Sequence, residues 1–241
     1  MTDLIYPIRI NRYLALKNIC SRREADVLIT KKIVIINGQI ARLGDKVNEK
    51  DVVEVDLKKK NIVKKYQYFA YNKPVGVVTH SPESNQKSIR EATALPDGFF
   101  PVGRLDKESH CLIILTNDVR LSDKLLNPEY DHEKEYVVRV NKPITNIFLK
   151  VLQRGILLED FKTKPAKVKQ ISEYVFLIVL TEGKKHQIRR MCTNFGFQVA
   201  DLQRTRIMDL ELGSIGIGKK RELIGDELIY LLRKLEINAI K

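Results

Sequence analysis

A short, strongly basic segment divides the chain into two parts and so limits the folds open to it. Between Leu57 and Tyr66 the sequence has five lysines and few side chains that a core could bury. Such a composition is typical of a charged connector between domains. We therefore predict an N-terminal domain over residues 1–60, a basic linker over 61–66 and a larger domain over 67–241.

The charge balance points to a polyanionic partner. Lysine and arginine number 43 against 30 acidic residues, a formal charge of +13, in a chain whose 44% hydrophobic content is typical of globular proteins. Each phosphate that such a protein neutralises releases condensed counterions, which favours binding. The sequence has no apolar run of the roughly 18 residues that a membrane span needs, and no signal-peptide pattern. Nucleic acid is therefore the expected partner, rather than a membrane.

The cysteines and histidines do not predict a disulfide framework or a metal site. They are widely spaced and form no C-x-x-C pair: Cys20, Cys111 and Cys192, with His80, His110, His132 and His186. Disulfide-rich domains and zinc sites need closer, paired spacings. We expect a cytoplasmic protein without a metal.

The first sixty residues predict two helices followed by short strands. Apolar residues between Ile10 and Leu16 approximate a helical stripe, and Ser21 with Glu24 forms a capping-box pattern for a second helix. The β-branched run at residues 33–36 ends at a tight-turn dipeptide, Asn37-Gly38. Residues 52–55 predict a further strand.

Basic side chains accompany these two helices. Scattered charges are usually a solvated face, but the free amides at a helix start also favour phosphate. The candidate RNA contacts here are Arg9, Arg12, Ser21, Arg22 and Arg23. The segment from Arg9 to Gly38 resembles the S4-type RNA-binding module. Lys32 stands where such modules usually have a glycine after the second helix. A left-handed lysine there would cost about 1 kcal/mol, unless the turn is built differently.

The larger part mixes strands and helices without strict alternation, which favours an α+β fold with a mixed, largely antiparallel sheet and flanking helices. The expected strands cover residues 68–71, 77–79, 111–115, 135–140, 175–180 and 207–212. The expected helices cover residues 118–126, 144–154, 186–195 and 226–235, with Thr145 as a cap and Gly155 and Gly196 as stops.

Asp106 lies just before the buried strand at residues 111–115, between the cations Arg104 and Lys107. The ordinary interpretation is a turn residue. The functional one is a reactive carboxylate, which a guanidinium would keep ionised and oriented, and Arg189 is the natural partner. Tyr136 is either a core tyrosine or a platform on which a base stacks.

Further basic residues surround these positions. Phosphate contacts or simple solvation would both explain Lys184, Lys185 and Arg190, and Lys73 and Arg104 are further candidate RNA contacts. His186, within the same basic loop, is interpreted as a structural hydrogen-bonding residue.

Five motifs occur in order along the larger part: Asn72-Lys-Pro-Val-Gly76, Gly103-Arg-Leu-Asp106, Leu115-Thr-Asn-Asp118, Glu133-Lys-Glu-Tyr136 and Gln187-Ile-Arg-Arg-Met191. This series resembles that of the RNA pseudouridine synthases that carry an S4 module, and within them the enzymes that modify 23S ribosomal RNA. The resemblance implies isomerisation of uridine in place by a monomer without a cofactor, with a transfer RNA as a second candidate substrate. It assigns the essential aspartate to Asp106, the stacking aromatic to Tyr136 and the aspartate's basic partner to Arg189.

Several alternatives stay open at this point. Attack on C1′, addition to the uracil ring and removal of a 2′ proton are all compatible with Asp106. Members of the resembled family commonly have glycine at the position of Cys111. A non-catalytic RNA-binding or ribosome-assembly protein would also explain the charge, and an aspartyl phosphohydrolase could use Glu108 to bind magnesium.

Overall fold

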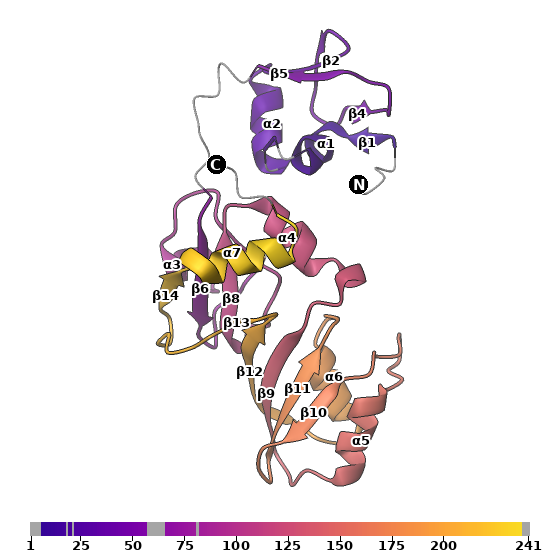
Figure 1. Cartoon of the computed structure of the whole chain (residues 1–241), viewed down its shortest axis with the longest axis vertical. Coiled ribbons are helices and arrows are strands. Elements are labelled where there is room, and N and C mark those ends of the chain that lie inside the picture. Colours follow the sequence, from indigo (N-terminus) through magenta and orange to yellow (C-terminus); the bar gives the residue numbers. More distant parts are fainter. Residues whose placement is uncertain (1–5, 18, 21, 57–65, 81, 238–241) are drawn as a thin grey trace. The chain divides into compact units, whose positions relative to one another are not determined.

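The computed structural model describes residues 6–17, 19–20, 22–56, 66–80 and 82–237. The chain forms two compact units, Met1–Lys65 and Tyr66–Lys241 (Figure 1). Two expectations lie outside the described residues: the helix cap at Ser21, and the linker at 61–66 apart from Tyr66.

The first unit packs two helices against short strands around its own core. The apolar faces of the helices supply buried residues such as Leu14 and Ala25, and Val34 comes from the strands. Two small antiparallel sheets have the orders β1-β4 and β3-β2-β5. The elements are β1 (Ile8–Arg9), α1 (Ile10–Leu16), α2 (Arg22–Thr30), β2 (Val34–Ile36), β3 (Gln39–Ile40), β4 (Lys46–Val47) and β5 (Val53–Val55).

Helix α2 ends in a left-handed residue, as the glycine usual at this position would suggest. Lys32 has φ +58°, and its amide donates to the carbonyl of Ile29 at 2.9 Å. The amide of Ile33 donates to Leu28 at 3.0 Å. These two bonds define a Schellman helix stop. The turn is therefore built in the usual way, and Lys32 adopts the left-handed conformation that is strained for a residue with a side chain.

The second unit is built on a nine-stranded sheet with the order β10-β11-β9-β12-β8-β6-β14 and with β13 and β7 paired to β12 and β8. Among the described strands of this sheet, β12 and β8 pair in parallel and the other pairs are antiparallel, so the expected α+β, largely antiparallel architecture is confirmed. The strands are β6 (Tyr68–Lys73), β7 (Phe100–Val102), β8 (His110–Thr116), β9 (Lys134–Val140), β10 (Lys167–Gln170), β11 (Val175–Leu180), β12 (Val199–Ile207), β13 (Leu210–Glu211) and β14 (Lys220–Glu222).

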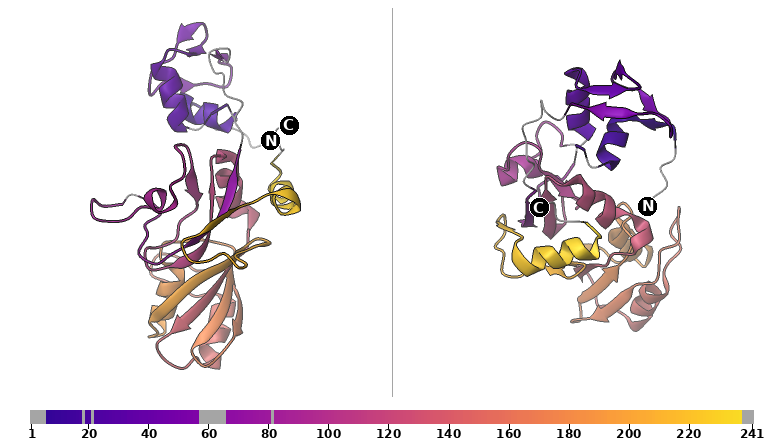
Figure 2. Two further views of the ribbon diagram at one scale, coloured as in Figure 1. Left: turned by 90° about the vertical axis from the view of Figure 1, so that its left-hand side faces the viewer. Right: turned by 45° about the horizontal axis from the view of Figure 1, so that its top comes forward.

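Helices cover both faces of this sheet. Because side chains alternate along a strand, Ile113 and Ile114 of β8 enter different clusters. Ile114 packs with α4 and α7, whereas Ile113 packs with α3. Figure 2 (left) shows α3 and α7 on opposite sides of the sheet. Helices α5 and α6 pack on β9, β11 and β12. The helices are α3 (Ile89–Thr93), α4 (Val119–Leu126), α5 (Asn146–Arg154), α6 (Gln187–Asn194) and α7 (Gly225–Lys234), with a 3-10 turn at Pro128–Tyr130.

Local signals placed most helix ends correctly. The hydroxyl of Thr145 accepts from the amide of Phe148 at 3.2 Å, and Gly155 and Gly196 end their helices at φ +81° and +68°. Two expected strands were wrong. Residues 77–79 contribute only an isolated bridge, Val78 to Ser88. The segment expected as one strand at 207–212 is divided by a turn: Ile207 ends β12, and Leu210–Glu211 forms β13.

Candidate active site

The Asp106 loop connects β7 to β8, and its backbone is held from several directions. The carbonyls of residues 105, 106, 107 and 108 each accept a hydrogen bond. The donors, in that order, are the hydroxyl of Thr79 (3.1 Å), the amide of Ser109 (3.0 Å), the amide of Gly76 (2.9 Å) and the guanidinium of Arg189 (3.0 Å). Satisfied carbonyls restrict the loop to one conformation. The turn after β6 and the helix α6 thus fix the backbone on either side of Asp106.

The carboxylate of Asp106 contacts a histidine. Nδ1 of His186 lies 3.0 Å from Oδ2 of Asp106, and the two side chains are 46% and 33% exposed. These two atoms lie within the distance of an ion pair, and the imidazole carries the positive charge only when it is protonated. Half exposure leaves the pair accessible from solvent. His186 was expected to be a structural hydrogen-bonding residue, and the group that its ring contacts is the candidate carboxylate itself.

Arg189 lies one turn into α6 and contacts the same loop at a different point. Its Nη2 donates to the carbonyl of Glu108 at 3.0 Å, and its Nη1 to the carbonyl of Val199 at 3.4 Å. In the part of the chain that the structure describes, no ion pair joins Arg189 to Asp106. The expected direct pairing is therefore corrected: Arg189 binds the backbone two residues beyond Asp106.

Lys73, the last residue of β6, is an internal residue. It is fully buried, and its ammonium donates to the carbonyls of Pro74 (2.9 Å) and Val77 (2.8 Å). Burial lowers the pKa of this ammonium to about 8, although the nearby carboxylates of Glu108 and Asp106 oppose the shift. A side chain enclosed by carbonyls cannot reach an RNA phosphate. The expected RNA contact of Lys73 is corrected to a buried contact beneath the Asp106 loop.

A row of paired residues crosses the sheet beside this loop. Lys73 is paired with Cys111, Cys111 with Arg204, Arg204 with Tyr136, and Tyr136 with Ile178. The row spans β6, β8, β12, β9 and β11. Residues directly paired in a sheet lie side by side. The register therefore brings together positions that are far apart in the sequence.

Arg204, in the middle of this row, was not among the candidate site residues expected from the sequence. It is 4% exposed, its Nε donates to the carbonyl of Leu112 at 2.8 Å, and its Nη2 is buried with no hydrogen-bond partner among the described residues. Buried cations normally find partners, so an unpaired N–H is notable. The sequence signal that could have identified Arg204 was an arginine in a segment that was not predicted to be a strand.

Tyr136 is half-buried on β9 and packs against the cluster that includes Leu105, the neighbour of Asp106. The charged residues before it attach β9 to β12. Arg206 lies 3.2 Å from Glu133 and 3.4 Å from Glu135. The charged motif therefore positions the strand that carries the tyrosine.

The remaining basic candidates lie mostly on the surface. Arg104, Lys184 and Lys185 of the second unit are exposed, as are Arg9, Arg12, Arg22 and Arg23 of the first. Arg190 instead forms an ion pair with Asp160 and lies over the ring of Phe161. An arginine already paired in this way has less charge to offer a phosphate.

A second polar cluster marks the start of β8. His110 lies 2.8 Å from Asp201, and the sulfur of Cys111 lies 3.1 Å from Nδ1 of His110. Burial, with Asp201 nearby, raises the pKa of the Cys111 thiol to about 11. The thiol is therefore protonated at neutral pH and a poor nucleophile. Cys111 also has φ +78°, which explains why glycine suits this position.

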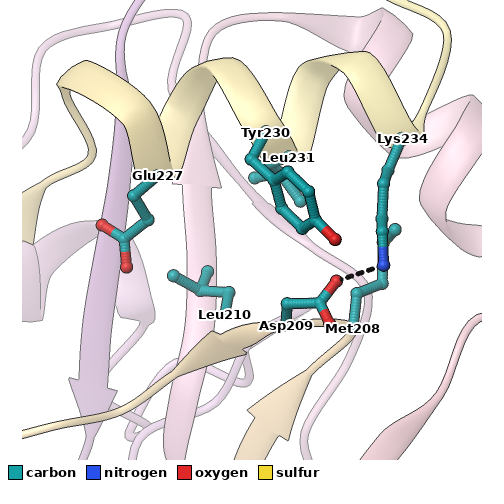
Figure 3. Close-up of a pocket in the computed structure, with 7 residues that line it drawn as sticks. All are labelled: Met208, Asp209, Leu210, Glu227, Tyr230, Leu231 and Lys234. Atoms are coloured by element: carbon teal, nitrogen blue, oxygen red, sulfur yellow. Dashed lines mark hydrogen bonds and ion pairs between the residues drawn. The ribbon is translucent and has the colours of Figure 1, made fainter.

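A hollow of about 230 Å³ lies between α7 and the turn after β12 (Figure 3). Its lining includes Leu210 and Leu231, with the ion pair of Lys234 and Asp209 at 2.6 Å. It shares no lining residue with the Asp106 loop. Within the described residues we find no cluster of three or more potential metal ligands and no helix able to cross a membrane.

Comparisons with known proteins relate the chain to one enzyme family. The RNA pseudouridylate synthase family model matches residues 67–194, and the S4 domain model matches residues 8–53. The chain is 42% identical over 231 residues to the dual-specificity RNA pseudouridine synthase RluF of Escherichia coli K12, covering 95% of this chain and 80% of that protein. The chain belongs to the RNA pseudouridine synthases. This synthase is accordingly an isomerase that acts on RNA.

Further relatives agree. The synthase is 34% identical to the ribosomal large subunit pseudouridine synthase B of Bacillus subtilis, covering 91% of this chain and 93% of that protein. A crystal structure of a pseudouridylate synthase superposes with a TM-score of 0.69 at 28% identity, covering 95% and 99% of the two chains. Membership of this family decides against the aspartyl phosphohydrolase and the non-catalytic RNA-binding protein.

Proposed function

We propose that this synthase converts a specific uridine of 23S ribosomal RNA to pseudouridine in the cytoplasm, as a monomer, with a transfer RNA as a second candidate substrate. The 42% identity to a relative named as a dual-specificity synthase supports this proposal. So does the similarity to a relative named for the large ribosomal subunit.

Asp106 is the proposed catalytic residue. In the reaction the N1–C1′ bond of uridine breaks, the uracil turns and C5 joins C1′. C5 loses a proton and N1 gains one, so atoms and charge balance without a co-reactant. The carboxylate can serve at C1′, at the uracil ring or at the 2′ proton. The observation that carries this assignment is the four bound carbonyls around Asp106, because a fixed backbone holds a reacting group in place.

Tyr136 and Arg189 complete the proposed site. The target base must leave its helix to react, at a cost of roughly a few kcal/mol. A tyrosine beside the Asp106 loop can stack on the extruded uracil and offset part of this cost. Arg189 supports Asp106 through the carbonyl of Glu108. Arg104, Lys184, Lys185 and Arg190 are the proposed contacts with the RNA backbone.

The proposed division of labour follows the predicted domains. Residues 1–60 bind RNA through Arg9, Arg12, Ser21, Arg22 and Arg23, residues 61–66 link the domains, and residues 67–241 carry the chemistry. Removing residues 1–60 should weaken RNA binding and reduce its salt dependence, with turnover retained on a short stem-loop. A folded truncation without turnover on that stem-loop would contradict this division.

Pseudouridine mapping of ribosomal and transfer RNA, from cells with and without the gene, tests the substrate. One 23S position should lose its pseudouridine when the gene is deleted and regain it with the wild-type protein. Asp106→Asn should fail to restore it and should lower turnover in vitro at least about a thousandfold. An unchanged 23S map would overturn the substrate, and normal turnover by Asp106→Asn would overturn the role of Asp106.

A further inference from the structure

The contact between His186 and Asp106 has an unusual local setting. His186 precedes α6 in a left-handed conformation, with φ +52° and ψ +27°, and its side chain makes no capping hydrogen bond to its own helix. Left-handed backbone is uncommon outside glycine, although asparagine, aspartate and histidine tolerate it best. The imidazole ring instead contacts the neighbouring loop, where Nδ1 lies 3.0 Å from Oδ2 of Asp106.

The contact engages one carboxylate oxygen. Oδ2 of Asp106 faces His186, whereas Oδ1 has no hydrogen bond to the residues that the structure describes. A close polar contact on one oxygen restricts rotation of the carboxylate and leaves the other oxygen for a substrate atom. Asp106 is one-third exposed, so an incoming nucleotide can approach it.

The hydrogen bonds of Arg189 go to groups other than the carboxylate of Asp106. Its guanidinium contacts the carbonyls of Glu108 and Val199 and lies 3.5 Å from the hydroxyl of Ser109. The start of α6 therefore makes two separate contacts with the loop. Arg189 holds its backbone, and His186 holds its carboxylate.

We propose that His186 is the positioning residue for Asp106, which sets the orientation of the carboxylate before the uridine arrives. This inference rests on the proposed role of Asp106. His186 acts through the aspartate and need not touch the reacting atoms. A misoriented carboxylate should slow the chemical step without changing how tightly the RNA is bound.

Three substitutions of His186 in the full-length protein separate positioning from other roles. Asparagine carries its amide on Cγ, as histidine carries Nδ1, and it also tolerates the left-handed backbone. Glutamine carries its amide one bond further out, and alanine has no donor. We expect His186→Ala to lower kcat on a stem-loop RNA by about ten- to a hundredfold with KM almost unchanged. His186→Asn should recover most of this loss, and His186→Gln should recover less.

Two controls keep the result interpretable. Lys169→Ala alters an exposed side chain of β10, and should change neither kcat nor KM. Asp106→Asn tests the proposed function separately: if it is inactive while His186→Ala has the wild-type kcat, only the role of His186 fails. Equal losses in all three His186 variants, or an effect on KM alone, would also overturn the inference. Thermal unfolding of each variant identifies any loss caused by misfolding, and His186→Asn then provides the decisive comparison.

Discussion

Arg189 donates through Nη2 to the carbonyl of Glu108 at 3.0 Å, and this bond joins α6 to the loop that carries Asp106. The arginine thus contacts the backbone rather than the carboxylate. Its fork of N–H groups reaches Glu108 and Val199 together. One side chain therefore links the Asp106 loop to the residue that begins β12.

Arg189→Lys should disrupt this link while retaining the charge. A lysine has a single ammonium in place of the planar fork, so it cannot reproduce the geometry with which Nη1 and Nη2 each reach a carbonyl. We expect a loss of about 1–2 kcal/mol in the free energy of unfolding, and a decrease in kcat larger than any change in KM. Urea unfolding and steady-state kinetics measure the two effects. A variant with wild-type stability and kcat would show that the contact of Arg189 with the two carbonyls contributes neither to folding nor to catalysis.

Lys73→Met should alter how stability depends on pH. The pKa of Lys73 falls from its ordinary value of 10.5 to about 8 in the folded protein. Between these values the unfolded chain binds more protons than the folded one, so Lys73 makes the free energy of unfolding rise with pH. We expect the wild-type slope between about pH 8 and 10 to exceed that of Lys73→Met by at most about 1.4 kcal/mol per pH unit. Parallel pH profiles from urea unfolding would contradict the buried position.

Lys32→Gly should stabilise the first unit by about 1 kcal/mol, because glycine adopts the left-handed stop without strain. Amide hydrogen exchange within α2 reports the change locally. Val27→Gly, in the middle of the same helix, is the matched control and should destabilise α2 by about 1 kcal/mol. If both glycines speed exchange equally, the strain assigned to Lys32 is absent.

Arg22→Ala combined with Arg23→Ala should weaken RNA binding mainly at low salt. Each phosphate contact that is lost lowers the slope of log K against log salt by about 1. We therefore expect a slope lower by up to about 2 from titrations at several salt concentrations. Lys73→Met, which also removes one positive charge but from a buried position, should leave the slope unchanged. Equal slopes for the wild type, the double variant and Lys73→Met would show that the RNA does not contact Arg22 and Arg23.

The thiols should react slowly in the folded protein. All three cysteines are buried and none forms a disulfide, and burial raises the pKa of Cys111 to about 11 and that of Cys192 to about 12. A protonated, enclosed thiol reacts poorly with disulfide reagents. Labelling at pH 8 should therefore require denaturant. Rapid labelling of Cys111 in the native protein would instead indicate that the start of β8 opens.

In the second unit, local sequence signals predicted the helices α4, α5, α6 and α7 and the strands β6, β8, β9 and β11. They did not predict α3, β7, β10 or β14. Asp118 precedes α4 and accepts from the amide of Arg120 at 3.1 Å, and Thr145 caps α5. These interactions involve residues only a few positions apart. Residue types and spacings within a short stretch of sequence are therefore enough to predict these caps.

The central strand β12 was missed because its sequence does not resemble a buried strand. Arg204 and Gln203 occupy its middle, and both are at least partly buried. Nε of Arg204 donates to the distant carbonyl of Leu112, and the side-chain amide of Gln203 donates to Asp201. Hydrophobic periodicity cannot anticipate a partner that lies almost a hundred residues away.

The sequence by itself determined the two-part organisation, the charge that favours RNA, and the motif series that placed Asp106 among candidate reactive groups. Those properties depend on residue types and short spacings. The tertiary structure decided which groups meet: His186 with Asp106 at 3.0 Å, Arg189 with Glu108 at 3.0 Å, and a buried Lys73 beneath them. Such contacts depend on strand register and on how α6 packs on the sheet. The sequence places several basic side chains that could contact the Asp106 loop, and only the packing decides which of them contacts the carboxylate and which the backbone.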